Sequence, residues 1–161
     1  MRDEVDDLVE AWARERDDLD LDALAVFSRI SRLARRLDLA RREAFNAHGI
    51  ESWEFDVLAA LRRAGAPYEM SPGRLLRETL VTSGTMTNRV DRLAARGFVE
   101  RSPDPDDRRG VIVRLTADGK TAVDGAFEAL VTAESRLLAD LPPRERARLA
   151  GLLRTLLAPF A

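Results

Sequence analysis

The order of the expected elements constrains the fold of this chain most strongly, because a pair of short helices is followed by a single hairpin. Ser71 and Pro72 begin the first short helix: a serine side chain can cap a free amide, and proline fits the first helical position. The second short helix starts at Thr82 or Ser83, ends at Ala95, and is followed by Gly97 as a stop signal.

The hairpin is expected over residues 98–102 and 111–115, joined by a turn-rich tip from Pro103 to Gly110. Val111, Val113 and Leu115 alternate with other residues, as in a half-buried strand. A lone two-stranded hairpin is marginal in water and must pack on neighbouring helices. This order of elements is that of a winged helix-turn-helix.

Longer helices flank this region on both sides. Apolar residues at helical spacing predict them over 5–16, 21–47, 53–64, 117–138 and 144–157. Gly49 can end the second of these helices, and Thr116 can cap the fourth. The expected fold class is therefore mainly α with a small β-wing.

The net charge of −2 hides a local basic region. Residues 1–22 carry ten acids and three arginines, whereas residues 23–48 carry six arginines and two acids. Residues 71–115, which include the helix pair and hairpin, carry nine arginines and six acids. A phosphate backbone responds to local charge, so a nucleic-acid partner remains plausible for this part of the chain.

The composition leaves little room for catalysis or metal binding. The chain has no cysteine and a single histidine, His48, so Ser-His or Cys-His catalysis and zinc sites lack their usual residues. We expect no enzyme activity, no cofactor and no metal. No apolar run is long enough to span a bilayer and the acidic start resembles no signal peptide, so a cytoplasmic location is expected.

Small polar side chains gather at the start of the second short helix. In a helix-turn-helix, the N-terminal side chains of that helix enter the major groove. We expect DNA contacts from seven residues of the helix pair: Ser71, Thr82, Ser83, Thr85, Thr87, Asn88 and Arg89. Serine and threonine can bond phosphates or base edges. An ordinary helix start selected for capping would have a similar composition, and this alternative stays open.

The hairpin tip combines acids with paired arginines. A carboxylate such as Asp107 could hold one guanidinium in place while Arg108 or Arg109 reaches into a narrow, electronegative minor groove. The alternative is a solvated turn with local ion pairs that are each worth little.

Four segments resemble the MarR family of bacterial regulators, and the similarity covers nearly the whole chain. They are Thr85–Arg89, Leu93–Arg101, Asp104–Gly110 and the run Leu115-Thr-Ala-Asp-Gly119. The resemblance implies that Asp107 and Arg109 form the structural pair of the wing, with Arg109 entering the minor groove.

The same resemblance implies a homodimer bound to a pseudo-palindromic operator in double-stranded DNA. Residues 1–48 and 117–161 would form the helical dimerisation region, with an extra N-terminal helix at about residues 4–16. Residues 49–116 would form the winged helix-turn-helix domain.

The extra acidic helix and the run Glu54–Leu58 are similar to the urate-responsive subgroup of this family. The resemblance places four ligand positions on Trp12, Asp56, Arg89 and Arg101. Two arginines can anchor an anionic heterocycle and an indole can pack against it, while Asp56 would neutralise the arginines of the empty site. Alternatively, Trp12 only fixes the extra helix, and Asp56 and Arg89 form a structural ion pair.

The sequence thus predicts a sequence-specific DNA-binding transcriptional regulator, with repression as the expected action. A small anionic effector such as urate would release it from its operator. The alternative is a ligand-independent winged-helix module that binds DNA or a protein partner.

Overall fold

A computed structural model describes residues 2–79, 82–105 and 110–160. The chain divides into two compact units, residues 1–40 and residues 41–161. The expected mainly helical fold with a small β-wing is confirmed.

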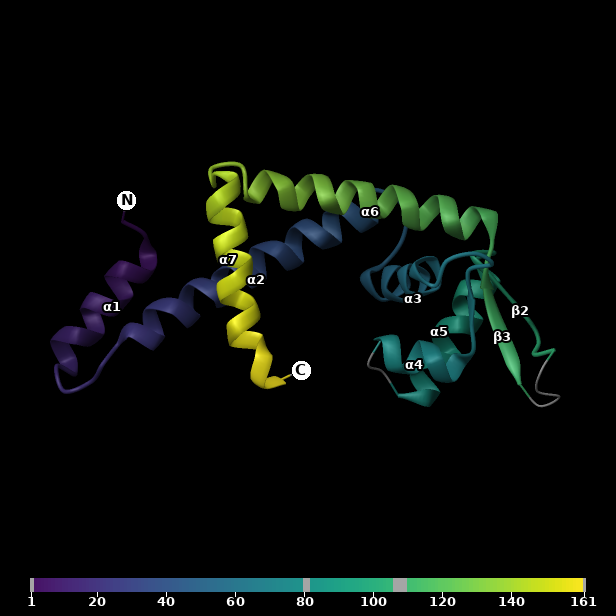
Figure 1. Ribbon diagram of the computed structural model, residues 1–161, viewed down its shortest axis with the longest axis horizontal. Coiled ribbons are helices and arrows are strands. Elements are labelled where there is room, and N and C mark those ends of the chain that lie inside the picture. The colour runs from purple at the N-terminus through teal and green to yellow at the C-terminus, as the bar shows by residue number, and fades with distance from the viewer. Residues whose placement is uncertain (1, 80–81, 106–109, 161) are drawn as a thin grey trace. The chain divides into compact units, whose positions relative to one another are not determined.

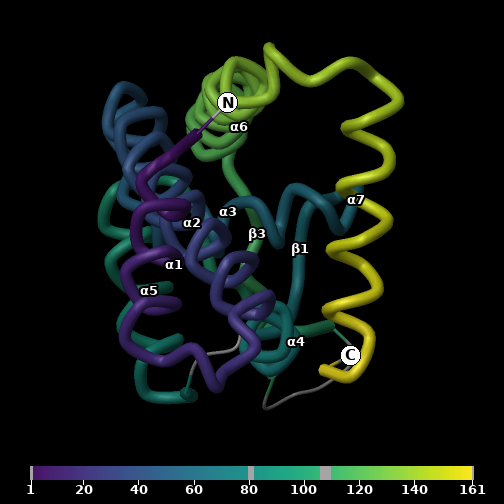
Figure 2. Tube along the Cα trace, turned by 90° about the vertical axis from the view of Figure 1, so that its left-hand side faces the viewer, coloured from purple at the N-terminus to yellow at the C-terminus, as the bar shows by residue number. Residues whose placement is uncertain are grey.

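The first unit contains α1 (Glu4–Glu15) and most of α2 (Asp22–Asn46), and α1 folds back beside the start of α2 (Figures 1 and 2). The Asp3 carboxylate caps α1 by accepting hydrogen bonds from the amides of Val5 and Asp6, at 2.8 and 3.1 Å. Arg29 of α2 pairs with Asp3 at 2.9 Å and with Asp6 at 2.7 Å, and Arg32 pairs with Glu4 at 2.7 Å. The acidic N-terminal helix therefore neutralises part of the arginine row of α2.

The second unit contains the end of α2 and all later elements. They are α3 (Ser52–Arg63), β1 (Glu69–Met70), α4 (Pro72–Thr79), α5 (Ser83–Ala95), β2 (Val99–Pro103), β3 (Val111–Leu115), α6 (Ala117–Leu137), α7 (Pro143–Leu157) and the short 3-10 helix η1 (Ala158–Phe160). Its core forms around α3, which packs against α6 on one side and α4 on another (Figure 1). Val57, Leu58 and Leu61 of α3 are fully buried there, as are Met86 and Leu93 of α5.

The sheet has three antiparallel strands in the order β1-β3-β2, so the prediction of only two strands is wrong. In β1, Glu69 pairs with Arg114 and Met70 with Val113 of the central strand. Two residues are too short to show an alternating pattern, which is why the sequence did not reveal β1. The third strand pairs with the free edge of β3, in which Val113 and Leu115 are buried as expected and Val111 is half-buried.

The three expected helix starts are confirmed, and a side chain caps the helix as expected at two of them. Ser71 Oγ accepts a hydrogen bond from the amide of Arg74 at 3.4 Å, and Thr116 Oγ1 accepts one from Gly119 at 3.0 Å. Thr82 precedes α5, but its hydroxyl bonds the hydroxyl of Thr85 at 3.0 Å and caps no amide.

Gly119 lies where α6 passes the chain between α5 and β2. A Cβ atom added at Gly119 would be 2.0 Å from the backbone oxygen of Phe98. The Thr116 hydroxyl also donates to the oxygen of Gly97 at 2.7 Å. The Leu-Thr-x-x-Gly sequence therefore joins the first turn of α6 to the start of the wing by close backbone packing.

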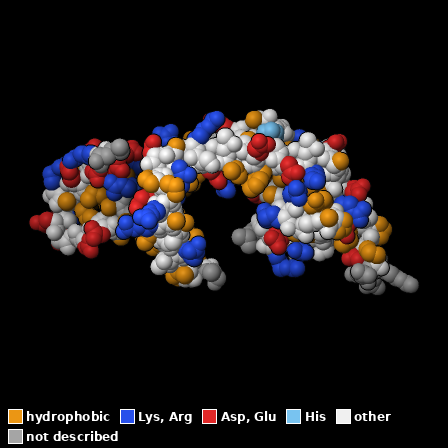
Figure 3. All heavy atoms as spheres, turned by 45° about the horizontal axis from the view of Figure 1, so that its top comes forward, with side chains coloured by type: hydrophobic (Ala, Val, Ile, Leu, Met, Phe, Trp, Pro, Cys, Tyr) orange, Lys and Arg blue, Asp and Glu red, His pale blue; other side chains and the backbone are white. Residues whose placement is uncertain are grey.

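Large hydrophobic side chains remain exposed on several helices of the described chain. They include Phe27 and Leu33 of α2, Phe127 and Val131 of α6, and Leu152, Leu156 and Leu157 of α7. Figure 3 shows hydrophobic side chains at the surface among charged groups of both signs. None of the described helices is long and apolar enough to cross a membrane.

Candidate DNA-binding and effector sites

The polar residues at the start of α5 lie on its solvent-exposed side. Thr82, Ser83, Thr85, Thr87 and Asn88 are exposed, and Arg89 is half-buried. The opposite side of the same helix is buried through Met86, Val90 and Leu93. One side of α5 thus packs on the core, while the other presents hydrogen-bonding groups to solvent.

Ser71 lies at the start of α4, is half-buried, and uses its hydroxyl as a helix cap. The wing residues Asp107, Arg108 and Arg109 lie outside the described residues. The strands that carry this tip are regular up to its base, where Pro103 pairs with Val111 and the amide of Asp104 donates to the oxygen of Gly110 at 3.0 Å.

Trp53, at the start of α3, belongs to the same surface, although the sequence analysis assigned it no function. The Cζ atom of Arg92 lies 4.6 Å from the centroid of its ring, and that of Arg89 lies 5.6 Å away. Trp53 Nε1 donates to Glu51 Oε2 at 2.9 Å, and Glu51 Oε1 accepts from Arg92 at 3.3 Å. The spacing of the two arginines on α5 was visible in the sequence, but the aromatic ring comes from another helix.

An open cavity of about 470 Å³ lies at this cluster. It is lined by Trp53, Gly84, Thr85, Asn88, Arg89 and Arg92. The cavity therefore combines three of the expected DNA-contacting residues with an aromatic ring and a second arginine.

The structure shows the surroundings of each of the four expected ligand residues within its own unit. Trp12 lies on α1 in the first unit, with 49% of its surface exposed. Asp56 lies on α3, and Arg89 on α5 is one of the charges that act on it. Arg101 of β2 forms an ion pair with Asp91 of α5. Asp56 and Arg89 thus interact electrostatically, while Arg101 already has a carboxylate partner.

Asp56 lies in a concave part of the surface. A cavity of about 200 Å³ is lined there by Phe55, Asp56, Ala59, Arg63, Glu78 and Thr79. Burial raises the pKa of the Asp56 carboxyl, and the nearby guanidinium groups of Arg89, Arg41 and Arg63 only partly oppose this shift.

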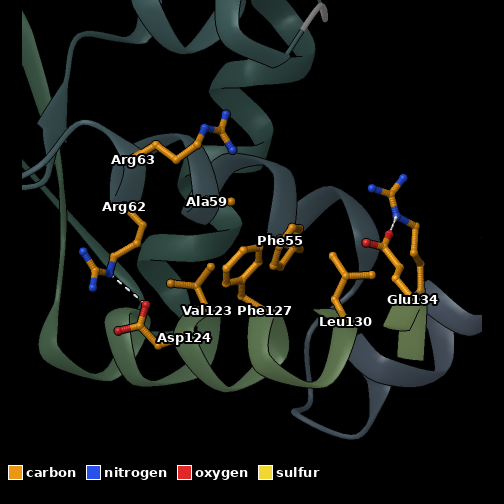
Figure 4. A pocket seen from close by; sticks show the side chains of 10 residues that line it. Phe55, Ala59, Arg62, Arg63, Val123, Asp124, Phe127, Leu130 and Glu134 are labelled. Atoms are coloured by element: carbon orange, nitrogen blue, oxygen red, sulfur yellow. Dashed lines mark hydrogen bonds and ion pairs between the residues drawn. The ribbon is translucent and has the colours of Figure 1, made fainter. Parts of the chain in front are cut away.

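A larger cavity of about 490 Å³ lies between α3, α6 and the end of α2 (Figure 4). Its middle is apolar, with Phe55 of α3 beside Val123, Phe127 and Leu130 of α6. Arg62 pairs with Asp124 at 2.8 Å at one end, and Arg41 pairs with Glu134 at 3.6 Å at the other. Apolar walls with charged ends suit a flat ring that carries an acidic group. Sequence reasoning did not find this cavity, because its walls read as ordinary amphipathic helix faces.

The described residues contain no group of histidine and carboxylate side chains able to hold a metal ion. His48 packs against α6, where a Cβ atom at Gly125 would lie 2.7 Å from its Nδ1. This contact gives His48 a packing role at the end of α2.

Comparisons with known proteins identify the family of this chain. Residues 48–110 match the family model described as MarR family. The transcriptional regulator PecS from Dickeya dadantii is 36% identical over 150 residues, which cover 93% of this chain and 90% of PecS.

Two solved structures are also similar. A MarR mutant from E. coli complexed with operator DNA superposes with a TM-score of 0.69 at 29% identity, covering 88% of this chain and 96% of that one. BpsR from Bordetella bronchiseptica, whose DNA binding is regulated by 6-hydroxynicotinic acid, superposes with a TM-score of 0.60 at 29% identity, covering 80% and 98%.

Proposed function

The chain belongs to the MarR family of DNA-binding transcriptional regulators, and from this premise we propose that it is a homodimeric repressor whose operator binding is relieved by a small planar anion. The two-sided character of α5 carries the DNA-binding part of this proposal. Its apolar side fixes the helix on the core, and its exposed polar side has the donors and acceptors that read base edges and phosphates.

Exposed apolar residues of α2, α6 and α7 support the homodimer. The described part of α7 has no buried residue, although leucines recur along it. A helix with such a face is stable when a partner covers it. We assign residues 1–48 and 117–161 to the dimerisation region and residues 49–116 to the winged helix.

Asp56 and Arg89 support an effector site next to the DNA-reading helix. The charges of Arg89, Arg41 and Arg63 act on the Asp56 carboxyl, which would balance them while no ligand is bound. An anion that takes over Arg89 would move a side chain of the helix expected to contact DNA, which gives the ligand different affinities for the two states. Trp12 and Arg101 complete the proposed site, and Arg101 would exchange Asp91 for the ligand.

Urate is the first ligand to test, and 6-hydroxynicotinic acid, which regulates BpsR, is the second. A ligand at about 100 times its Kd stabilises a protein by about 2.7 kcal/mol. At 2–4 °C per kcal/mol, this predicts a rise in melting temperature of about 5–11 °C.

Trp12→Ala and Arg101→Ala should reduce this thermal shift, whereas Arg144→Ala, an exposed arginine at the start of α7, should not. A shift that persists in both test variants but disappears in Phe127→Ala would move the effector to the cavity of Figure 4. If neither ligand changes the melting temperature at millimolar concentration, neither is the effector.

The DNA-binding part is tested by gel shift on promoter fragments from the chromosomal neighbourhood of the gene. Retention of one fragment at salt concentrations that release unrelated DNA supports the proposal. Retention that no metabolite relieves would favour a ligand-independent DNA binder. Failure to retain any fragment at low salt would favour a module that binds protein partners.

A further inference from the structure

Trp53, Arg89, Arg92 and Glu51 form a cluster at the surface, where Glu51 is also the N-cap residue of α3. Glu51 and Arg92 have side chains that are 58% and 56% exposed. An ion pair at such exposure contributes little to folding. Yet the structure uses both oxygens of Glu51, one on the indole and the other on Arg92, and places two guanidinium groups near one ring.

The indole restricts where the two arginines can lie. Arg89 and Arg92 are three residues apart on α5, so they share one side of the helix. A guanidinium group that packs against an aromatic ring uses its face for this contact and keeps its N–H groups free for an acceptor. Trp53 therefore holds two long side chains that would otherwise sample many rotamers at the edge of an open cavity.

The remaining walls of the cavity favour a polyatomic anion as the ligand. Thr85 and Asn88 add hydrogen-bonding groups beside the two positive charges, and Gly84 leaves its part of the wall free of side-chain atoms. Glu51 holds Arg92 by one long hydrogen bond of 3.3 Å, which two oxygens of a phosphate can replace with a bidentate pair of bonds.

We propose that this cavity docks one backbone phosphate of DNA, that Trp53 positions Arg89 and Arg92 for it, and that Glu51 holds Arg92 until the phosphate takes its place. The inference rests on the proposed DNA-binding function. It adds the start of α3, through Trp53 and the N-cap residue Glu51, to the elements that set DNA affinity. Because a phosphate contact carries no base information, the site acts equally on all duplexes.

The test measures duplex affinity at several salt concentrations for the retained promoter fragment and for an unrelated duplex of equal length. Arg92→Ala should weaken both about fivefold and reduce the slope of log affinity against log salt by about one. Trp53→Leu should act in the same direction, and Trp53→Phe should restore most of the affinity because the ring face remains.

Glu51→Gln should change duplex affinity in the opposite direction to Arg92→Ala. This difference distinguishes phosphate docking from a purely structural cluster. The amide can still accept the indole hydrogen bond, but it releases Arg92 and repels no phosphate, so both duplexes should bind about two- to fivefold more tightly. Glu145→Gln on α7 makes the same change in net charge at an exposed carboxylate far along the chain and should leave both affinities unchanged. Equal tightening by the two variants would overturn the proposal.

The other outcomes are also decisive. Wild-type affinity in both Arg92→Ala and Glu51→Gln, with normal binding by the parent protein, overturns the phosphate site alone. If the parent protein binds no duplex, the proposed function is overturned. Inorganic phosphate at constant ionic strength tests a free anion: a melting shift that Arg92→Ala abolishes, with unchanged duplex affinity in that variant, would reassign the cavity to free phosphate.

Discussion

The ion pair between Glu54 and Arg96 gives the most direct test of how α5, the proposed DNA-reading helix, is held on α3. Glu54 lies in the first turn of α3, with only 1% of its side chain exposed, and Arg96 follows the last residue of α5 with 40% exposed. Glu54 accepts hydrogen bonds from Arg96 and, at 2.8 Å, from the amide of Glu51. Arg96 also donates to the oxygen of Gly49 at 2.7 Å.

Because Glu54 is buried and Arg96 is partly exposed, replacing Glu54 and replacing Arg96 should lower the unfolding free energy by different amounts. In Glu54→Gln the amide still accepts hydrogen bonds and Arg96 can turn to water, so the loss in unfolding free energy should be about 1–2 kcal/mol. In Arg96→Met the Glu54 carboxylate remains buried without its partner, so the unfolding free energy should fall by about 3–5 kcal/mol. At 2–4 °C per kcal/mol, the second change lowers the melting temperature by about 6–20 °C.

Chemical denaturation of the two single variants and the double variant measures this asymmetry. The double variant should lose less than the sum of the single losses, with an interaction of about 0.5–3 kcal/mol. Glu100→Gln is the matched control, because its pair with Arg114 is exposed on both sides and should cost below about 0.5 kcal/mol. Equal losses in Glu54→Gln and Arg96→Met would refute the argument from exposure.

Three further predictions concern the wing, the start of α6 and the effector site. Arg109→Ala should weaken operator and unrelated duplexes alike with a shallower salt slope, and unchanged affinity in a gel-shift titration would contradict the wing assignment. Gly119→Ala should lower the melting temperature because its Cβ meets the Phe98 oxygen, whereas Gly73→Ala on α4, with open space around it, should not. Because burial raises the pKa of Asp56, its charged form is disfavoured in the folded chain, so Asp56→Asn should raise the melting temperature at pH 7. That gain should shrink as the pH falls and vanish below about pH 3, where the wild-type carboxyl is protonated in both states, and a loss at pH 7 would contradict it.

Local signals made much of the helix-turn-helix predictable. The start of α4 is set by Ser71 and Pro72, and that of α6 by Thr116, so their positions follow from capping chemistry within a few residues of sequence. Strand β3 was predicted with its observed bounds, because alternation over five residues is a strong strand signal. Strand β1 has two residues and exists only because β3 offers it an edge to pair with.

Sequence patterns did not reveal two of the site residues, and the reason differs from that for β1. Trp53 and Glu54 lie on α3, and each acquires its role from an arginine about forty residues later on or after α5. No periodicity within α3 distinguishes such side chains from an ordinary amphipathic helix. The apolar lines of α2 and α7 were read correctly as hydrophobic faces, but a single chain leaves several of their residues exposed, so only an assembly could bury them.

Arg89 links the proposed effector site to the proposed phosphate site. Its guanidinium group lies near the ring of Trp53, and the same side chain lowers the cost of charging Asp56. An anion bound with Asp56 and Arg101 would draw Arg89 away from Trp53, and a DNA phosphate would draw it toward the ring. The two ligands would then compete for one side chain from α5, so removal of Trp53 should weaken DNA binding while making effector binding easier. A Trp53→Leu variant that loses DNA affinity but keeps the wild-type affinity for the effector would show that the two sites do not share Arg89.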